Sequence, residues 1–220
     1  MLLETLIMKK EKLTTVKASV TLEQALAILE ESGYRCIPVL DETGQIFRGN
    51  IYKMHIYRHK SNNGDMTLPV TSLLKNATKT IQMDSPFFKV FFNIKDLPYI
   101  AVLDEKNIFY GILTHSKLLD MLSDAWNINL SNYVLTVTST GKQGDLASMS
   151  KIIAKYVSIG GCMTLDAREE VGVRRTLFTL PLDTTEETLN KITKRLTRKG
   201  FQVTEIDNLQ TGTVISYEDK

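Results

Sequence analysis

The stretch FRGNIYKMHI (Phe47–Ile56) returns later in the chain as FYGILTHSKL (Phe109–Leu118). Both stretches begin with phenylalanine, place glycine two positions later, and have an aliphatic residue two positions after the glycine, Ile51 or Leu113. The first half of each stretch has the aromatic and branched residues that are typical of a strand. The second half has the alternation of polar and apolar residues that is typical of a helix. The chain therefore contains an internal repeat of a strand followed by a helix.

The residues before each stretch repeat as well. Thr21–Gly33 has apolar residues at helical spacing, and its first and last residues are a predicted N-cap and a predicted C-terminal stop. A buried strand is predicted at Tyr34–Asp41, followed by a hairpin turn. Ser85–Pro98 and Tyr99–Asn107 are the matching segments of the second copy. Such a repeat predicts two copies of one supersecondary unit that pack together.

The C-terminal part of the chain has a different order of elements. Strands are predicted at Asn132–Thr140, Gly160–Glu169, Gly172–Leu182 and Phe201–Asp207, and helices at Leu146–Ser158 and Thr184–Gly200. The second and third strands are predicted to form an antiparallel pair that turns at Glu169–Gly172. This βαββαβ order predicts a ferredoxin-like α+β fold.

Composition and charge narrow the class of protein. Hydrophobic residues make up 43% of the chain and charged residues 24%, and the net charge is +2. These values are ordinary for a globular protein, and the charge is too small to indicate a nucleic-acid or membrane partner. The N-terminal MLLETLIMKKEK places its lysines after its apolar residues, opposite to a signal peptide, and no apolar run is long enough for a membrane span. We expect a soluble, cytoplasmic protein.

Neither cysteines nor histidines form a pattern that indicates catalysis or metal binding. Cys36 and Cys162 lie far apart, which favours a reducing compartment. His55 and His59 are four residues apart on a predicted helix, but no carboxylate or cysteine accompanies them at motif spacing, and His115 is isolated. The chain also lacks a Walker loop and a dinucleotide glycine fingerprint. We therefore expect no enzyme activity, no metal and no cofactor.

The repeated part resembles the paired CBS domains that form a Bateman module. The resemblance rests on LIMKKEKLTTV (Leu6–Val16), IPVLDETGQIFRGNI (Ile37–Ile51) and GILTHSKLL (Gly111–Leu119). It implies one CBS domain over residues 1–75 and a second over 76–126. It also implies a module that dimerises into a disc and binds adenine nucleotides in clefts between the copies.

The C-terminal part, with its short glycine loop before the first helix, resembles an ACT domain over residues 131–210, followed by a tail over 211–220. ACT domains commonly dimerise edge to edge, and some bind amino acids beside that loop. Gly141 stands where amino-acid-binding ACT loops typically have aspartate, and Asp145 is the carboxylate that would have to replace it. The resemblance therefore favours a domain that only dimerises. The full expected fold is a Bateman module plus a ferredoxin-like ACT domain.

The two copies differ from nucleotide-binding CBS domains where the repeated strand ends. Such domains typically end Gly-Ile-Val-Thr-x-x-Asp, and the Thr and Asp face the ligand. Tyr52 and Thr114 stand at the Thr position, and His55 and Lys117 stand at the Asp position. Neither copy keeps the carboxylate that would accept hydrogen bonds from two free ribose hydroxyls. A donor at this position suits a ligand that carries phosphate near its ribose.

A cyclic dinucleotide has this property, because its 3′ hydroxyl is esterified. Arg35 and Lys53 add cations beside the first copy's cleft. The combination of a CBS pair and an ACT domain, without an attached enzyme, is similar to the cyclic di-AMP-binding CBS–ACT proteins of Gram-positive bacteria. The resemblance implies a signal receiver that binds cyclic di-AMP, forms a homodimer and regulates an unknown protein partner.

The adenine is expected beside the strand starts of one copy. Copy one is favoured because Arg35, Lys53 and His55 surround its cleft. The complete set of predicted ligand-binding residues is Thr15, Val16, Arg35, Cys36, Ile37, Tyr52, Lys53, His55, Thr80, Tyr99, Ile100, Thr114 and Lys117.

Three alternatives to cyclic di-AMP binding remain open at this point. The CBS pair can be a sensor of AMP, ATP or S-adenosylmethionine, although the missing carboxylate argues against it. The ACT domain can be an amino-acid sensor. The chain can also be a purely structural dimerisation protein.

Overall fold

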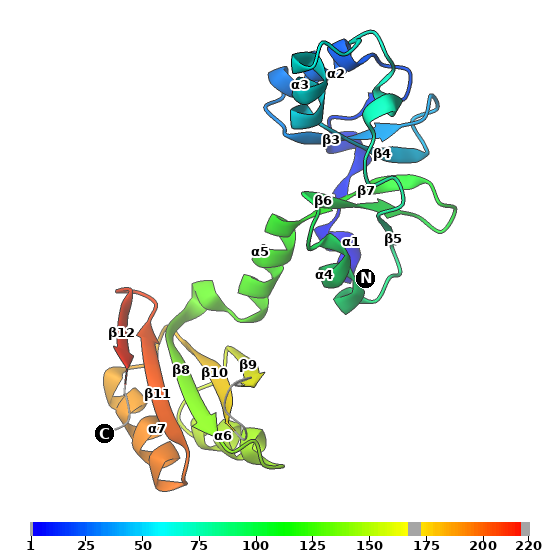
Figure 1. The fold of residues 1–220 in the computed structure, drawn as a ribbon. Helices are drawn as coiled ribbons and strands as arrows, with labels where there is room; N and C mark the ends of the chain where they lie inside the picture. Colours follow the sequence, from blue (N-terminus) through cyan, green and yellow to red (C-terminus); the bar gives the residue numbers. More distant parts are fainter. Residues whose placement is uncertain (1, 167–172, 217–220) are drawn as a thin grey trace. The chain divides into compact units, whose positions relative to one another are not determined.

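The computed structural model describes residues 2–166 and 173–216 of the chain. The chain divides into two compact units, residues 1–119 and 120–220, called the first and the second unit below (Figure 1). None of the described helices is long and apolar enough to cross a membrane.

The first copy of the repeat forms a sheet of three strands. The strand order is β2-β3-β4, with β2 and β3 parallel and β3 and β4 antiparallel. A capping box at Thr21 starts α2, because its hydroxyl accepts from the Gln24 amide and the Gln24 side chain accepts from the Thr21 amide. The elements are β2 (Val16–Lys17), α2 (Leu22–Glu31), β3 (Cys36–Leu40), β4 (Phe47–Tyr52), α3 (Lys53–Ser61) and the 3₁₀ turn η2 (Val70–Leu73).

The second copy forms a sheet with the order β1-β7-β6-β5. Cys36 pairs with Tyr52 in the first copy, and Tyr99 pairs with Thr114 at the matching place in the second copy. This shared register confirms the internal repeat. The elements are α1 (Leu2–Leu6), β1 (Met8–Lys9), the 3₁₀ turn η1 (Lys10–Lys12), β5 (Thr80–Gln82), α4 (Phe87–Ile94), β6 (Tyr99–Leu103), β7 (Phe109–Thr114) and α5 (His115–Ala125).

The repeated glycine allows a second backbone segment to approach each hairpin. Lys9 in β1 lies opposite Gly111 in β7, and a Cβ atom at Gly111 would lie 2.2 Å from the carbonyl oxygen of Met8. In the first copy, a Cβ atom at Gly49 would lie 3.0 Å from the carbonyl oxygen of Lys75, and Gly49 has a φ of +143°. Both hairpins therefore need glycine where an added segment passes.

We expect Gly111→Ala to lower the free energy of unfolding of the first unit by about 1–3 kcal/mol, because β1 must move away from β7 to make room for the methyl group. Chemical denaturation followed by circular dichroism measures the change, and the unfolding of the second unit is the internal reference. Unchanged stability of the first unit would mean that β1 does not pack against Gly111.

The two copies pack together through the faces of their sheets, as the repeat predicts. The rings of Phe47 and Phe109 stack with centroids 5.7 Å apart, and the Phe109 amide donates to the Gln45 carbonyl at 2.7 Å. The cluster between the copies consists of Cys36, Leu40, Phe47, Tyr99, Ala101, Phe109 and Ile112, all buried. Strand residues of both copies therefore share one core.

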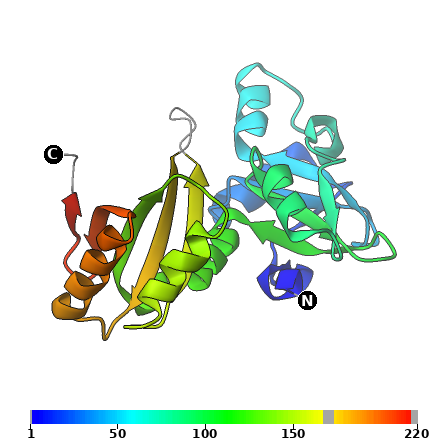
Figure 2. The same cartoon turned by 90° about the horizontal axis from the view of Figure 1, so that it is seen from below.

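The second unit has the predicted βαββαβ order and an added strand. Its sheet is antiparallel with the order β12-β11-β8-β10-β9, which is the ferredoxin-like arrangement extended at one edge. Both helices pack on one face of this sheet (Figure 2). The elements are η3 (Ile128–Leu130), β8 (Ser131–Ser139), α6 (Asp145–Ile153), β9 (Gly161–Asp166), β10 (Arg174–Pro181), α7 (Glu186–Arg198), β11 (Gln202–Asn208) and β12 (Thr213–Ser216).

Some details of the structure differ from the sequence predictions. β12 falls within the predicted tail and pairs with β11 after a turn at Gly212, where φ is +68°. α6 ends at Ile153, and the amides of Tyr156 and Val157 both donate to the Ile153 carbonyl in a closing turn. The β9–β10 pairing is confirmed, whereas its predicted turn at Glu169–Gly172 lies outside the described residues. The domain boundaries inside the first unit stay predictions.

Candidate functional site

The strand ends that carry the predicted site meet between the two copies. Cys36, at the start of β3, lies beside Tyr52 at the end of β4, and Tyr99, at the start of β6, lies beside Thr114 at the end of β7. The Cys36 thiol donates a hydrogen bond to the Tyr99 hydroxyl at 3.7 Å. The predicted binding residues of copy one and those of copy two, which the sequence predicts as alternative sites, are therefore in contact.

A buried polar network continues from this contact. The Tyr99 hydroxyl donates to Oδ1 of Asn50 at 2.8 Å, and Asn50 is 1% exposed. The side-chain Nδ2 of Asn76 donates to the Tyr52 hydroxyl at 2.7 Å. Burial raises the pKa of Cys36 to about 11 and that of Tyr52 to about 12, and it also raises the pKa of Tyr99. The thiol and both phenols are therefore uncharged at neutral pH and hold the two copies together through hydrogen bonds.

His55 stands at the edge of this network. Its ring centroid lies 5.2 Å from that of Tyr52, and its Nδ1 atom is buried without a hydrogen-bond partner among the described residues. Burial lowers the pKa of His55, and the charges of Lys75 and Arg58 lower it further. The imidazole is therefore neutral at pH 7, and an anion beside it would raise its pKa again.

A cavity of about 370 Å³ opens at His55. Its two cations, Arg58 and Lys75, come from different segments. Arg58 belongs to α3, and Lys75 lies beside α3 because its backbone pairs with that of Asn50 in β4. The lining residues are His55, Arg58, His59, Asn62, Ser72, Leu73, Leu74 and Lys75. Two cations and two imidazoles line this cavity, with no carboxylate among its described lining residues, which makes it an anion-binding environment.

The other predicted binding residues of copy one do not line this cavity. The Lys53 amide donates to the Arg35 carbonyl at 3.0 Å, which ties the start of α3 to the start of β3. Val16 and Ile37 are buried in the first copy's core, and Thr15 precedes β2. Of the predicted residues, His55 alone lines the cavity, and Arg58, His59 and Lys75 were not in the predicted set.

In copy two, the Thr114 hydroxyl accepts from the Lys117 amide at 3.3 Å and thereby closes the first turn of α5. Thr80 pairs with Ala101 in the sheet, and Ile100 is 1% exposed in the core. These contacts give the copy-two residues structural roles.

A second cavity, of about 470 Å³, lies at the glycine loop of the second unit. Asp145 accepts a hydrogen bond from the Lys142 amide at 3.0 Å and closes this loop. Arg174 and Thr176 of β10 also line the cavity, and the Thr176 hydroxyl is buried without a partner among the described residues. Gly141, where the resemblance to ACT domains expects aspartate, lines it as well.

The comparisons with known proteins concern the repeated part. The family model of the CBS domain matches residues 5–61. No curated protein matches the chain. Within the described residues, no group of three or more His, Cys, Asp or Glu side chains is placed to hold a metal ion.

Solved structures with the same fold include CBS proteins. CbpB in complex with c-di-AMP is 17% identical over 55% of this chain and 83% of that chain, with a TM-score of 0.50. CbpB from Streptococcus agalactiae is 16% identical over 56% and 81%, with a TM-score of 0.51. A CBS domain protein from Streptococcus pneumoniae TIGR4 is 21% identical over 55% and 85%, with a TM-score of 0.50. The chain thus has a CBS-pair fold, followed by a unit with the ferredoxin-like topology of ACT domains.

Proposed function

We propose that this chain is an intracellular signal receiver without catalytic activity, which binds cyclic di-AMP in its CBS pair and thereby regulates a partner protein. The observation that carries the proposal is the cavity at His55, which Arg58 and Lys75 make cationic and which no carboxylate lines. The likeness in fold to CbpB in complex with c-di-AMP is consistent with it.

The chemistry of this cavity favours a phosphodiester over a free ribose. Arg58 and Lys75 offer donors and positive charge that suit a phosphate, and neither side chain can accept a hydrogen bond from a ribose hydroxyl. The unpartnered Nδ1 atom of His55 can donate or accept according to its protonation. We place the phosphate against these three side chains.

Calorimetric titration of the purified protein with cyclic di-AMP, AMP, ATP and S-adenosylmethionine tests the proposal. Saturable binding of cyclic di-AMP that Lys75→Ala weakens would support it. Preferential binding of a mononucleotide or of S-adenosylmethionine would instead make the protein a sensor of that ligand. The absence of binding by all four would contradict nucleotide sensing and favour a structural role.

We expect the affinity for cyclic di-AMP to increase as the pH falls from about 8 to about 6, by at most about tenfold per pH unit for one proton taken up. His55 has a lowered pKa in the free protein, and a bound phosphate would raise it, so binding takes up a proton between the two values. The phosphodiesters keep their charge in this range, so the dependence reports on the protein.

Titrations in buffers of different ionisation enthalpy measure the proton uptake. His55→Gln should abolish it, whereas His59→Gln, whose ring is bonded to the Asp65 carbonyl at 3.1 Å, should preserve most of it. An affinity that does not change with pH would remove His55 from contact with the phosphate.

We also propose that the chain acts as a homodimer. Met54, Phe92 and Leu119, on α3, α4 and α5, are 66%, 83% and 64% exposed, which is unusual for such large apolar side chains. Sedimentation equilibrium measures the oligomeric state, and a protein that stays monomeric at high concentration would contradict the proposed homodimer.

One observation favours a second candidate function, amino-acid sensing by the second unit. The loop cavity contains the Asp145 carboxylate and the Arg174 guanidinium, opposite charges that suit the two charged groups of an amino acid. A thermal-shift screen with the standard amino acids tests this function, and a hit that Asp145→Asn abolishes would support it. No shift with any amino acid would leave the domain a dimerisation module.

A further inference from the structure

A groove between the two helices of the second unit has the size of a small-ligand site. α6 and α7 pack against each other on the sheet, and the groove along them has a volume of about 360 Å³. Ile152 and Phe201, each 8% exposed, form its apolar base, and Ser148 lies at its edge. Volumes of this order are typical of cavities for small molecules.

Cationic side chains line both sides of this groove. Lys151 and Lys155 come from α6 and the turn that follows it. Arg195 lies in the last turn of α7, and Lys199 directly follows that helix. Among the residues that the structure describes, no acidic side chain lines the groove. Within residues 2–166 and 173–216, the structure records no ion pair for any of these four cations.

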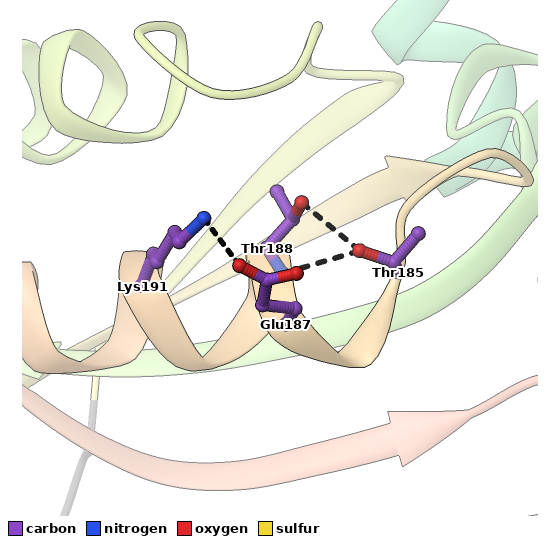
Figure 3. A network of polar contacts seen from close by, with 4 residues as sticks. All are labelled: Thr185, Glu187, Thr188 and Lys191. Carbon is purple, nitrogen blue, oxygen red and sulfur yellow. Dashed lines mark hydrogen bonds and ion pairs between the residues drawn. The ribbon is translucent and has the colours of Figure 1, made fainter.

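A neighbouring lysine on α7, in contrast, forms an ion pair. Lys191, one turn before Arg195, pairs with the carboxylate of Glu187 at 2.6 Å (Figure 3). Glu187 lies in the first turn of α7, which Thr185 caps by accepting a hydrogen bond from the Thr188 backbone amide at 3.2 Å. The Thr185 hydroxyl also donates to that of Thr188. Lys191 is therefore locally balanced, unlike the four cations of the groove.

Helix stability explains only part of this arrangement. Arg195 lies in the last turn of α7 and Lys151 in the last turn of α6, where positive charge is favourable. That effect does not depend on which way a side chain faces around the helix. It therefore gives no reason for four like charges from two segments to surround one groove, where they repel one another.

We propose that this groove binds an oligophosphate anion, either free or as the phosphate chain of a nucleotide. A triphosphate carries several negative charges along a short chain, which can contact lysines on one side and Arg195 on the other. The Ser148 hydroxyl can donate a further hydrogen bond. The groove lies in the second unit, so this site is separate from the cyclic di-AMP site proposed at His55.

Calorimetric titration of the full chain with sodium tripolyphosphate at low salt tests this inference. We expect saturable binding that Lys155→Gln and Arg195→Gln each weaken about tenfold, because each removes a charge-assisted contact. Lys191→Gln is the matched control and should change the affinity less than about twofold. His55→Gln should leave tripolyphosphate binding unchanged, which separates this site from the proposed nucleotide site.

Two further titrations identify what the groove recognises. ATP that binds as tightly as tripolyphosphate, and whose affinity Arg195→Gln lowers to the same extent, supports the site. If ATP binds more tightly than tripolyphosphate, the result also indicates that the groove recognises a nucleotide. Three results would overturn the inference: no saturable tripolyphosphate binding, equal weakening in Lys191→Gln, or displacement of tripolyphosphate by a short acidic peptide at a lower concentration than by ATP.

Discussion

Replacing Phe109 with alanine is expected to lower the free energy of unfolding of the first unit by about 3–5 kcal/mol. Phe109 is 1% exposed in the cluster between the two copies, and its ring stacks on that of Phe47. Its removal leaves a cavity between two sheets that meet through strand residues, so neither sheet can close the gap without moving as a whole. Chemical denaturation, followed by circular dichroism and near-ultraviolet signals, measures the change.

Two phenylalanines serve as matched controls. Phe92 is 83% exposed on α4 in a single protomer, so Phe92→Ala, measured at a protein concentration at which the monomer predominates, should change the stability by less than about 0.5 kcal/mol. Phe178 is fully buried in the second unit, so Phe178→Ala should lower the stability of that unit and leave the first unit unchanged. A loss below about 1 kcal/mol in Phe109→Ala would mean that the copies do not share a core.

The largest expected change in binding comes from restoring a carboxylate at the strand end. His55→Asp should weaken cyclic di-AMP by roughly 100-fold, which corresponds to about 3 kcal/mol, because the carboxylate faces the ligand's phosphate. The same change gives a free ribose an acceptor, so the affinity for AMP should not fall. Calorimetric titration with both ligands measures the reversal of preference.

The equivalent substitution in the second copy is the control. Lys117 occupies the same position of the repeat, so Lys117→Asp places a carboxylate at the other strand end and, in addition, removes a cation. We expect a loss of less than about threefold, since the proposed phosphate contacts lie in the first copy. If Lys117→Asp had the larger effect, the proposed assignment to copy one would be wrong.

The sequence predicted the fold because its signals are local. The N-cap at Thr21 and the glycine stop at Gly33 predicted α2, and the repeated Phe-x-Gly pattern identified both hairpins before any contact was known. The βαββαβ order of the second unit followed in the same way. The added strand β12 was missed because it is only four residues long and all of them are exposed.

The candidate site was less predictable because tertiary contacts assemble it. Comparison of the two copies drew attention to His55, but Lys75 lies at the end of the first predicted domain, where the repeat offers no alignment. Its place beside α3 depends on backbone pairing with Asn50. In the sequence, Arg58 cannot be distinguished from an ordinary exposed cation on a helix, and only the structure shows that it lines the cavity.

The pairing of β1 with β7 has a consequence for how the chain folds. Met8 pairs with Ile112. β1, one of the first strands to be synthesised, can therefore pair with β7 only after nearly the whole first unit has been synthesised. Until then the edge of β1 is unpaired, and a chain interrupted between the copies would leave it so. The two copies repeat one another in sequence, yet the second copy cannot complete its sheet without β1 from the N-terminus, whereas the first copy forms its sheet from its own strands: the repeated unit and the unit of cooperative folding differ.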